Sequence, residues 1–250
     1  MNLVTYPCDN PLCSCQIDHE TKKFKCMNSK KDNGRAVVSF ANNPFYQEKM
    51  KRLQQSVESQ GVKFIGYTSF EQVGCKPHSE VPYQFKPYAI KKAISEGVTT
   101  LLWCDSPLVA IKDLSHIFDH IERFGYVFFN NYGHPLGKWT NDKCLNWFDI
   151  TRDQSMNIKQ IMACCMGFGL KRYFADKFIY NILTTYQLTS DSLYPGSWDN
   201  HRHDQSVMSC LIHNSGLEIL DGHKSYFIYE HFKQVPEFQP IAESVCLISR

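Results

Sequence analysis

The sequence predicts an α/β fold with a mostly parallel, Rossmann-like central sheet and flanking helices. Three apolar, strand-like runs occur between residues 35 and 104, and a helix-like run lies between each pair of neighbours. Strands that alternate with helices pair in parallel, because each helix returns the chain to the starting edge of the sheet. A chain of 250 residues is long enough for one large domain of this kind.

The first half follows this alternation closely. Asn43 and Pro44 suit the N-cap and first position of a helix, and Gly61 and Gly97 are typical of helix ends. The expected strands are 35–41, 62–67 and 99–104. The expected helices are 44–60 and 88–96, with an irregular loop over 68–83.

The second half is less regular. Its expected helices, from their apolar periodicity, are 114–124, 171–188 and 204–215. Its expected strands are the aromatic run 126–130 and the short runs 217–220 and 225–229. The Gly-rich stretch 131–139 and residues 191–200 are expected to form turns and loops, and 162–170 is an apolar run with two glycines.

Composition excludes some classes of protein. The net charge of +2 argues against a dedicated nucleic-acid binder, which is normally more basic. No apolar run approaches the roughly 20 residues that span a bilayer, and residues 1–10 lack the pattern of a signal peptide. The eleven cysteines, several within apolar runs, suit reduced thiols in a cytoplasmic protein.

Residues 1–34 differ from the rest of the chain and are expected to form a separate N-terminal arm. They are polar and contain four cysteines, Cys8, Cys13, Cys15 and Cys26. Four thiolates can close a tetrahedral zinc site, but one pair is C-x-C and the next gap is long. A zinc site and a loosely ordered arm or hairpin both remain open.

An acid follows the third strand of the first half. Asp105 ends the apolar run Thr99–Cys104, and Pro107 then breaks the ladder. In open α/β sheets, ligands bind at the carboxyl ends of the strands, where a carboxylate can hold a cation and through it a diphosphate. The alternative is a turn residue, since Asp-Ser-Pro is ordinary turn chemistry.

Two further segments place charge at the start of helices. Lys86 is unfavourable for the dipole of a helix N-terminus, which suggests either a bound anion there or a solvated lysine. Asp204 follows His201, Arg202 and His203 at the start of another helix. Asp204 is either a helix cap or part of a titrating, possibly metal-binding, cluster.

Two loops complete the candidates. Residues 221–224, Asp-Gly-His-Lys, form either a tight turn or a site in which His223 binds metal and Lys224 binds phosphate. The Gly-rich loop 133–139, with Asp142 after it, is either a plain surface loop or a sugar site in which Trp139 stacks on a sugar face.

Taken together, the order and spacing of these motifs over about residues 35–230 resemble a GT-A glycosyltransferase. The similarity is greatest to small GT-A-like proteins of large DNA viruses and aquatic microbes. It rests on Leu102-Trp103-Cys104-Asp105-Ser106 at a strand end, the stretch Tyr132 to Trp139, and His201 to Gln205 at a helix start. The resemblance makes residues 35–250 a single GT-A-like domain.

The resemblance also assigns roles. Asp204 is the catalytic residue, as a general base or beside the anomeric carbon. Asp105 and His223 hold Mn²⁺ or Mg²⁺, although Pro107 stands where the family's D-x-D motif has its second acid. The implied donor-binding residues are Phe40, Ala41, Asn42, Lys86, Asp105, Ser106 and Lys224, and the implied acceptor-binding residues are Trp139, His203 and Asp142.

The implied reaction moves a sugar from a UDP- or GDP-sugar to a hydroxyl of a glycan or glycoprotein. Inversion and retention of configuration both remain open. Alternatives are a catalytically degenerate carbohydrate- or nucleotide-binding protein and a nucleotidyltransferase, which needs several acids near its metal. The implied partners include no nucleic acid and no membrane span, and a viral origin would place the enzyme in the host cytoplasm.

Overall fold

The computed structural model describes residues 15–17, 24–26, 34–170, 173–221, 227–229 and 247–249. The chain divides into two units, Met1–Gly34 and Arg35–Arg250. In the first unit, β1 (Cys15–Ile17) pairs antiparallel with β2 (Phe24–Cys26), and Cys15 lies opposite Cys26.

The second unit is built on a five-stranded sheet. Its strands, in spatial order, are β4 (Lys63–Tyr67), β3 (Arg35–Phe40), β5 (Thr100–Cys104), β8 (Lys159–Gly169) and β7 (Tyr126–Pro135). All run in one direction except β8, which is antiparallel to both of its neighbours. Val38 pairs with Trp103, so β3 and β5 end at the same edge of the sheet. The predicted α/β class and mostly parallel sheet are confirmed.

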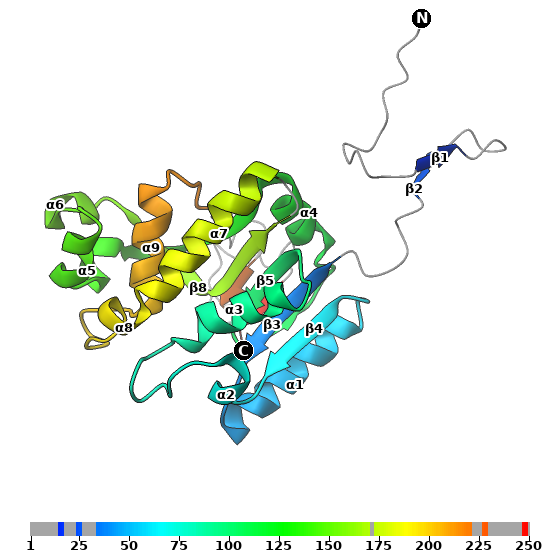
Figure 1. The fold of residues 1–250 in the computed structure, drawn as a ribbon, viewed down its shortest axis with the longest axis horizontal. Coiled ribbons are helices and arrows are strands. Elements are labelled where there is room, and N and C mark those ends of the chain that lie inside the picture. The colour runs from blue at the N-terminus through cyan, green and yellow to red at the C-terminus, as the bar shows by residue number, and fades with distance from the viewer. Residues whose placement is uncertain are drawn as a thin grey trace, which may run out of the picture. The chain divides into compact units, whose positions relative to one another are not determined.

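Helices cover both faces of this sheet. One face carries α1 (Pro44–Glu58) and α4 (Ser115–Phe124). The other carries α3 (Phe85–Ser95), α7 (Tyr173–Leu188) and α9 (Asp204–Asn214), which lie side by side over the sheet in Figure 1. The sheet is therefore buried on both sides, which explains why its strands are apolar runs and do not alternate with polar residues.

Short elements connect these layers. The short helices are α2 (Phe70–Val73), α5 (Asp142–Trp147), α6 (Arg152–Ser155) and α8 (Ser190–Leu193), with one 3₁₀ turn, η1 (Leu136–Trp139). A second sheet has β10 (Leu247–Ser249) between β6 (Leu108–Ala110) and β9 (Phe227–Tyr229).

The helix signals read from the sequence behave as expected at α1. The Asn43 side chain accepts a hydrogen bond from the backbone N–H of Tyr46, and Pro44 occupies the first helical position. Gly61 follows the helix with a φ of 72°, a conformation that glycine adopts without strain. Three of this helix's apolar residues, Met50, Leu53 and Val57, are buried.

Several boundaries differ from the prediction. The loop expected over 68–83 contains α2, whose N-cap Ser69 and Gln72 bond reciprocally. Helix α3 begins at Phe85, three residues earlier than expected, because a proline at position 87 is tolerated in the first turn. The expected strand 217–220 is reduced to one bridge, between Leu220 and Phe129.

The Gly-rich stretch 131–139 was predicted as a turn, and this is wrong in part. Strand β7 continues to Pro135, and only then does the chain turn through η1. An irregular register between β7 and β8 accommodates this stretch, including Gly133 with a φ of 77°. The strand extension brings Trp139 to the start of α9, where its carbonyl accepts a hydrogen bond from the Arg202 backbone N–H at 2.9 Å.

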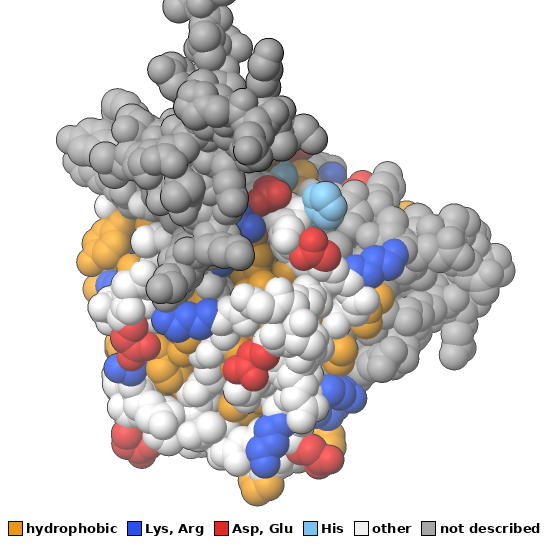
Figure 2. All heavy atoms as spheres, turned by 90° about the vertical axis from the view of Figure 1, so that its right-hand side faces the viewer, with side chains coloured by type: hydrophobic (Ala, Val, Ile, Leu, Met, Phe, Trp, Pro, Cys, Tyr) orange, Lys and Arg blue, Asp and Glu red, His pale blue; other side chains and the backbone are white. Residues whose placement is uncertain are grey.

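Other properties of the described part of the chain are as follows. Six cysteines there are free thiols, and four of them (Cys104, Cys144, Cys165 and Cys210) are buried. None of the described helices has the length and apolar character needed to cross a membrane. On the face shown in Figure 2, the coloured Lys and Arg side chains are interspersed with Asp and Glu, so neither sign dominates there.

Candidate active site

The centre of the candidate site is a buried ammonium group between two carboxylates. Lys86, in the first turn of α3, is 3% exposed. Its Nζ lies 3.2 Å from Oδ1 of Asp105 and 3.1 Å from Oδ2 of Asp204. It also donates a hydrogen bond of 3.1 Å to the carbonyl of Ala163 in β8. We call Lys86, Asp105 and Asp204 the charged trio.

Electrostatics keep Lys86 charged. Burial by itself would lower the pKa of Lys86, but Asp105 and Asp204 outweigh it and raise that pKa above its ordinary value. Burial raises the pKa of Asp204; Lys86 opposes this shift and the neighbouring Asp105 adds to it. Two acids thus share one cation, an arrangement typical of sites that manage charge during a reaction.

Asp105 is the member of the trio that is open to solvent. Its side chain is 31% exposed, and its Oδ1 accepts a 2.8 Å hydrogen bond from the indole Nε1 of Trp103. Its backbone N–H donates to Cys164 in β8, and its carbonyl accepts from Leu108 N–H across the turn at Pro107. The turn therefore exists, and it leaves the Asp105 carboxylate free to face the edge of the sheet.

Asp204 is held from behind. Its Oδ2 accepts a 3.1 Å hydrogen bond from the hydroxyl of the buried Tyr186 on α7, in addition to the ion pair with Lys86. The residue before it, His203, has a φ of 49° and makes no side-chain cap bond. Asp204 is the first residue of α9, and its side chain faces the trio, so the interpretation of Asp204 as a helix cap is wrong.

The two neighbouring histidines are held by backbone groups. His201 accepts from the Asn141 N–H at Nδ1, so its Nε2 donates to the Leu193 carbonyl, at 2.6 Å. Burial lowers the pKa of His201 to about 4, which keeps the ring neutral. His203 donates from Nδ1 to the carbonyl of Tyr194 at 2.8 Å. A metal set of His201, His203 and Asp204 is therefore not what the structure forms.

Aromatic rings lead from the charged trio to the surface. The Tyr83 ring lies 5.2 Å from the Lys86 Nζ, and its centroid lies 5.5 Å from that of the His203 ring. His203 is in turn 5.6 Å from the ring of Trp198, which is 49% exposed. We call Tyr83, His203 and Trp198 the aromatic wall.

The residues predicted to contact the donor base lie at the same edge as Asp105. Phe40 is buried and stacks on Phe85 with ring centroids 4.4 Å apart. Ala41 is also buried, and its N–H donates to Tyr67 at 3.0 Å. Asn42 is exposed just beyond the end of β3. Of these three, Asn42 is the side chain that a ligand at this edge can reach.

The remaining predicted residues are more scattered. Ser106 is buried next to Asp105. Asp142 forms an ion pair with Arg152, and its side chain is 76% exposed and does not join the trio. His223 and Lys224 lie outside the described residues. Lys86, Asp105 and Asp204 are thus the predicted residues that the structure brings together, and the solvated-lysine interpretation of Lys86 is wrong.

Sequence reasoning missed three residues of the site. Tyr186 occupies an ordinary apolar position of a helix, and nothing in its local pattern distinguishes it from a core residue. Trp103 was noticed for its strand, but its bond to Asp105 depends on side-chain direction. Tyr83 lies in an irregular segment with a φ of 60°, a conformation that sequence patterns do not predict for tyrosine.

The implied Mn²⁺ or Mg²⁺ needs several oxygen or nitrogen ligands at one point. Among residues 34–170 and 178–221, whose side chains the structure describes, no three His, Cys, Asp or Glu side chains converge. Asp105 and Asp204 are both paired with Lys86, and Pro107 supplies no ligand. These residues alone do not fit a divalent cation, and the remaining predicted ligand, His223, is outside this part of the chain.

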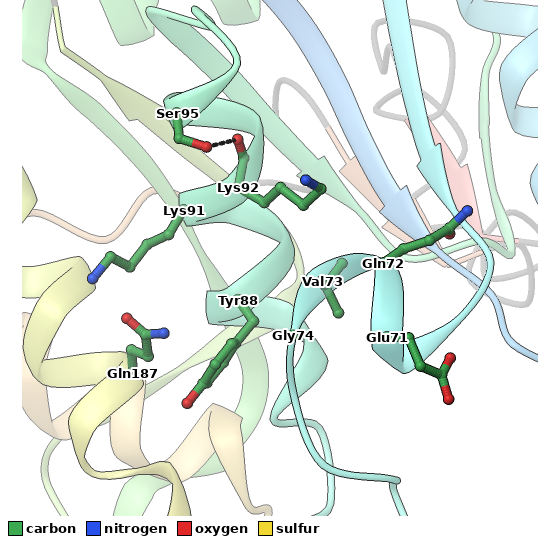
Figure 3. A pocket seen from close by; sticks show the side chains of 9 residues that line it. All are labelled: Glu71, Gln72, Val73, Gly74, Tyr88, Lys91, Lys92, Ser95 and Gln187. Carbon is green, nitrogen blue, oxygen red and sulfur yellow. Dashed lines mark hydrogen bonds between the residues drawn. The ribbon is translucent and has the colours of Figure 1, made fainter.

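A separate hollow lies between α2, α3 and α7, away from the trio's acids (Figure 3). It has a volume of about 440 Å³, and Glu71, Tyr88, Lys91, Lys92 and Gln187 are among its lining residues. None of the residues predicted from the sequence lines it. The hollow is therefore not the site to which the sequence motifs point.

Comparison with known proteins gives a result in structure but not in sequence. No protein-family model matches the chain, and no curated protein matches it in sequence. A glycosyltransferase involved in the glycosylation of the major capsid of PBCV-1 superposes with a TM-score of 0.51 at 13% identity, over 86% of this chain and 91% of that one.

Two further glycosyltransferases resemble it over 86% of its length. The bifunctional WbbM matches with a TM-score of 0.54 at 11% identity, over 45% of its own chain. Mouse xyloside xylosyltransferase 1 matches with a TM-score of 0.50 at 9% identity, over 97% of its chain. At these identities the likeness establishes the fold and not the substrate. The protein has a GT-A glycosyltransferase-like fold.

Proposed function

We propose that the protein is a glycosyltransferase that moves a sugar from a nucleotide-diphosphate donor to a hydroxyl of a glycan or glycoprotein. The observation that carries the proposal is the charged trio, in which Lys86 lies between Asp105 and Asp204. It sits at the edge where β3 and β5 end, the usual place for ligands in an open α/β sheet.

Lys86 supports the donor half of this proposal. A nucleotide diphosphate leaves with negative charge, which must be met by fixed positive charge or by a metal. Lys86 is held charged and in place by three partners, so it needs no rearrangement when that charge develops. We propose that a UDP- or GDP-sugar binds at Lys86, Asp105 and Ser106, with its base near Phe40–Asn42 and its phosphates also near Lys224.

Asp105 and His223 remain the proposed ligands of Mn²⁺ or Mg²⁺. When bound, such an ion would supply positive charge to the departing diphosphate. The described residues do not form this site by themselves. Lys86 provides a resident positive charge beside Asp105 in either case.

Asp204 is the proposed catalytic residue. Both of its described contacts fall on Oδ2, which leaves Oδ1 to accept a hydroxyl. Burial raises its pKa toward the range in which a carboxylate is an effective general base. In an inverting enzyme Asp204 would take the acceptor proton, and in a retaining enzyme it would stabilise positive charge at the anomeric carbon. Trp139, His203 and Asp142 are the proposed acceptor contacts.

Calorimetry with UDP, GDP, UDP-glucose and GDP-mannose, each with and without Mn²⁺, tests the donor proposal. Binding of one nucleotide class, weakened in Asp105→Ala, is the expected result. A protein that binds no nucleotide under either condition is not a nucleotide-sugar transferase. Tight binding without turnover would instead favour the degenerate binding protein, to which the proline at position 107 is the sequence pointer.

A further inference from the structure

A guanidinium group stacks against two indole rings beside the candidate active site. The Cζ of Arg202 lies 4.0 Å from the ring centroid of Trp198 and 4.1 Å from that of Trp139. The Arg202 backbone N–H bonds to the Trp139 carbonyl and to the hydroxyl of the buried Ser206. We call Trp139, Trp198 and Arg202 the Trp–Arg cluster.

The stacking leaves the polar edge of Arg202 unused. A guanidinium that packs against aromatic rings keeps its five N–H donors in its own plane, directed away from the rings. Within the described part of the chain, the Arg202 side chain has neither a hydrogen-bond acceptor nor a carboxylate within ion-pair distance. Asp199 acts on it only through longer-range charge. The group is thus fixed in direction while its donors are unmet.

The surroundings of Trp139 add positive charge. The Nζ of Lys138 lies 5.4 Å from the Trp139 ring, and the His134 ring lies 5.5 Å from it. Planar oxyanions such as carboxylates and phosphates match a guanidinium edge with two parallel hydrogen bonds. An indole face beside such a group suits the apolar face of a sugar.

The Trp–Arg cluster is continuous with the charged trio. Trp198 contacts both Tyr83 and His203 of the aromatic wall, with ring centroids 6.2 and 5.6 Å apart. Tyr83 in turn covers the Lys86 ammonium. A ligand spanning this path would place one end at the cluster and the other near Asp204.

We infer that the Trp–Arg cluster is an acceptor subsite for an acidic glycan, with Arg202 binding a carboxylate or phosphate carried by the sugar. The word acceptor rests on the proposed transferase function, whereas anion recognition by Arg202 does not. A charged pair of hydrogen bonds of this kind should favour an acidic sugar over its neutral counterpart by about tenfold or more.

Ligand-observed NMR titration tests this directly. Methyl β-glucuronide is compared with methyl β-glucoside for the carboxylate, and glucose 6-phosphate with glucose for the phosphate. The proteins are the wild type, Arg202→Gln, Arg202→Lys and Arg123→Gln. Arg123 is a matched control, because it is exposed and stacks on Phe124 at 5.2 Å on the far helix α4.

The expected result is a tenfold or greater preference for one acidic sugar in the wild type and in Arg123→Gln. That preference is lost in Arg202→Gln and reduced in Arg202→Lys, whose single ammonium cannot make two parallel bonds. Equal binding of acidic and neutral sugars, no binding of either, or a preference that survives in Arg202→Gln would overturn the inference. The wild-type comparison decides even if a variant fails to fold.

Affinity for UDP and GDP, measured on the same samples, separates this inference from the proposed function. A loss of nucleotide affinity in Arg202→Gln would assign Arg202 to the donor and overturn the acceptor subsite. An acidic-sugar preference in a protein that binds no nucleotide would leave the anion site standing and remove the transferase. Nucleotide turnover without any acidic-sugar preference would do the reverse.

Discussion

Lys86 is 3% exposed, yet it carries a charge that two carboxylates share at 3.1 and 3.2 Å. Burying an ion is costly, and a buried pair rarely adds stability over apolar residues of the same size. Such a cost is more easily understood at a site that acts on charged ligands. The difference between its two partners, Asp105 open to solvent and Asp204 enclosed, suits a division of labour between donor and acceptor.

The substitution Asp204→Asn tests this division. We expect turnover to fall by roughly 10²- to 10⁴-fold, as when a positioned acid–base group is lost. Donor affinity should be retained, since the diphosphate is proposed to bind at Lys86 and Asp105. Because Asp204 makes no cap bond, the start of α9 should be unaffected. Steady-state rates and calorimetry on the same preparation separate the two effects, and unchanged turnover would remove Asp204 from the mechanism.

The same variant also changes how stability depends on pH. Burial raises the pKa of Asp204 in the folded protein, so the folded state retains this proton to higher pH than the unfolded chain, whose value is about 3.9. The wild type therefore loses stability as pH rises from about 4 through the raised folded pKa. Asn does not titrate, so the free energy of unfolding of the variant, relative to wild type, should increase over that interval in urea melts. A pH-independent difference would contradict the shift.

At the scale of elements, the site depends on contacts between segments distant in the sequence. The 3₁₀ turn η1 is joined to the start of α9 through the buried hydroxyl of Ser206, which donates a 2.6 Å hydrogen bond to the Trp139 carbonyl. It also accepts from the Arg202 N–H at 3.0 Å. This one hydroxyl fixes Trp139 and Arg202 relative to each other.

Ser206→Ala should therefore destabilise the protein by about 1 to 3 kcal/mol, because a buried carbonyl and N–H each lose a partner. Thermal unfolding measures the loss, with Ser192→Ala as a control, since Ser192 makes a long 3.4 Å bond within one turn. A melting temperature equal to that of the control would show that η1 is held by other contacts.

The same scale shows how far the sequence leads. Apolar runs with Gly and Pro punctuation predicted β3, α1, β4 and β5 to within two residues, because these signals are local. The continuation of β7 through residues 131–135 could not be predicted, since it depends on pairing with β8. For the site, the charge of Lys86 and Asp105 drew attention to them, but their meeting with Asp204 depends on how α3 and α9 pack.

At the scale of the whole molecule, the chain consists of the unit Met1–Gly34 and the larger unit Arg35–Arg250. The charged trio, the aromatic wall and the Trp–Arg cluster all belong to the larger unit. We predict that deletion of residues 1–34 leaves the affinity for UDP or GDP within about twofold, as such terminal segments commonly tolerate removal. Calorimetry of the shortened chain checks this, and a large loss, or zinc found in the full chain by elemental analysis, would make the arm part of the working unit.

The central claim is that the trio at the end of β5 supports transfer of sugar from a nucleotide donor. The most direct measurement is release of UDP or GDP from a panel of nucleotide-sugars, in the wild type and in Asp105→Ala. We predict that the wild type hydrolyses at least one donor. The Asp105→Ala variant should be inactive yet folded, with a loss of stability on the order of 1 kcal/mol or less, because its side chain is partly exposed and Lys86 keeps Asp204 as a partner. No release from any donor by the wild type, or equal release by the variant, would contradict the claim.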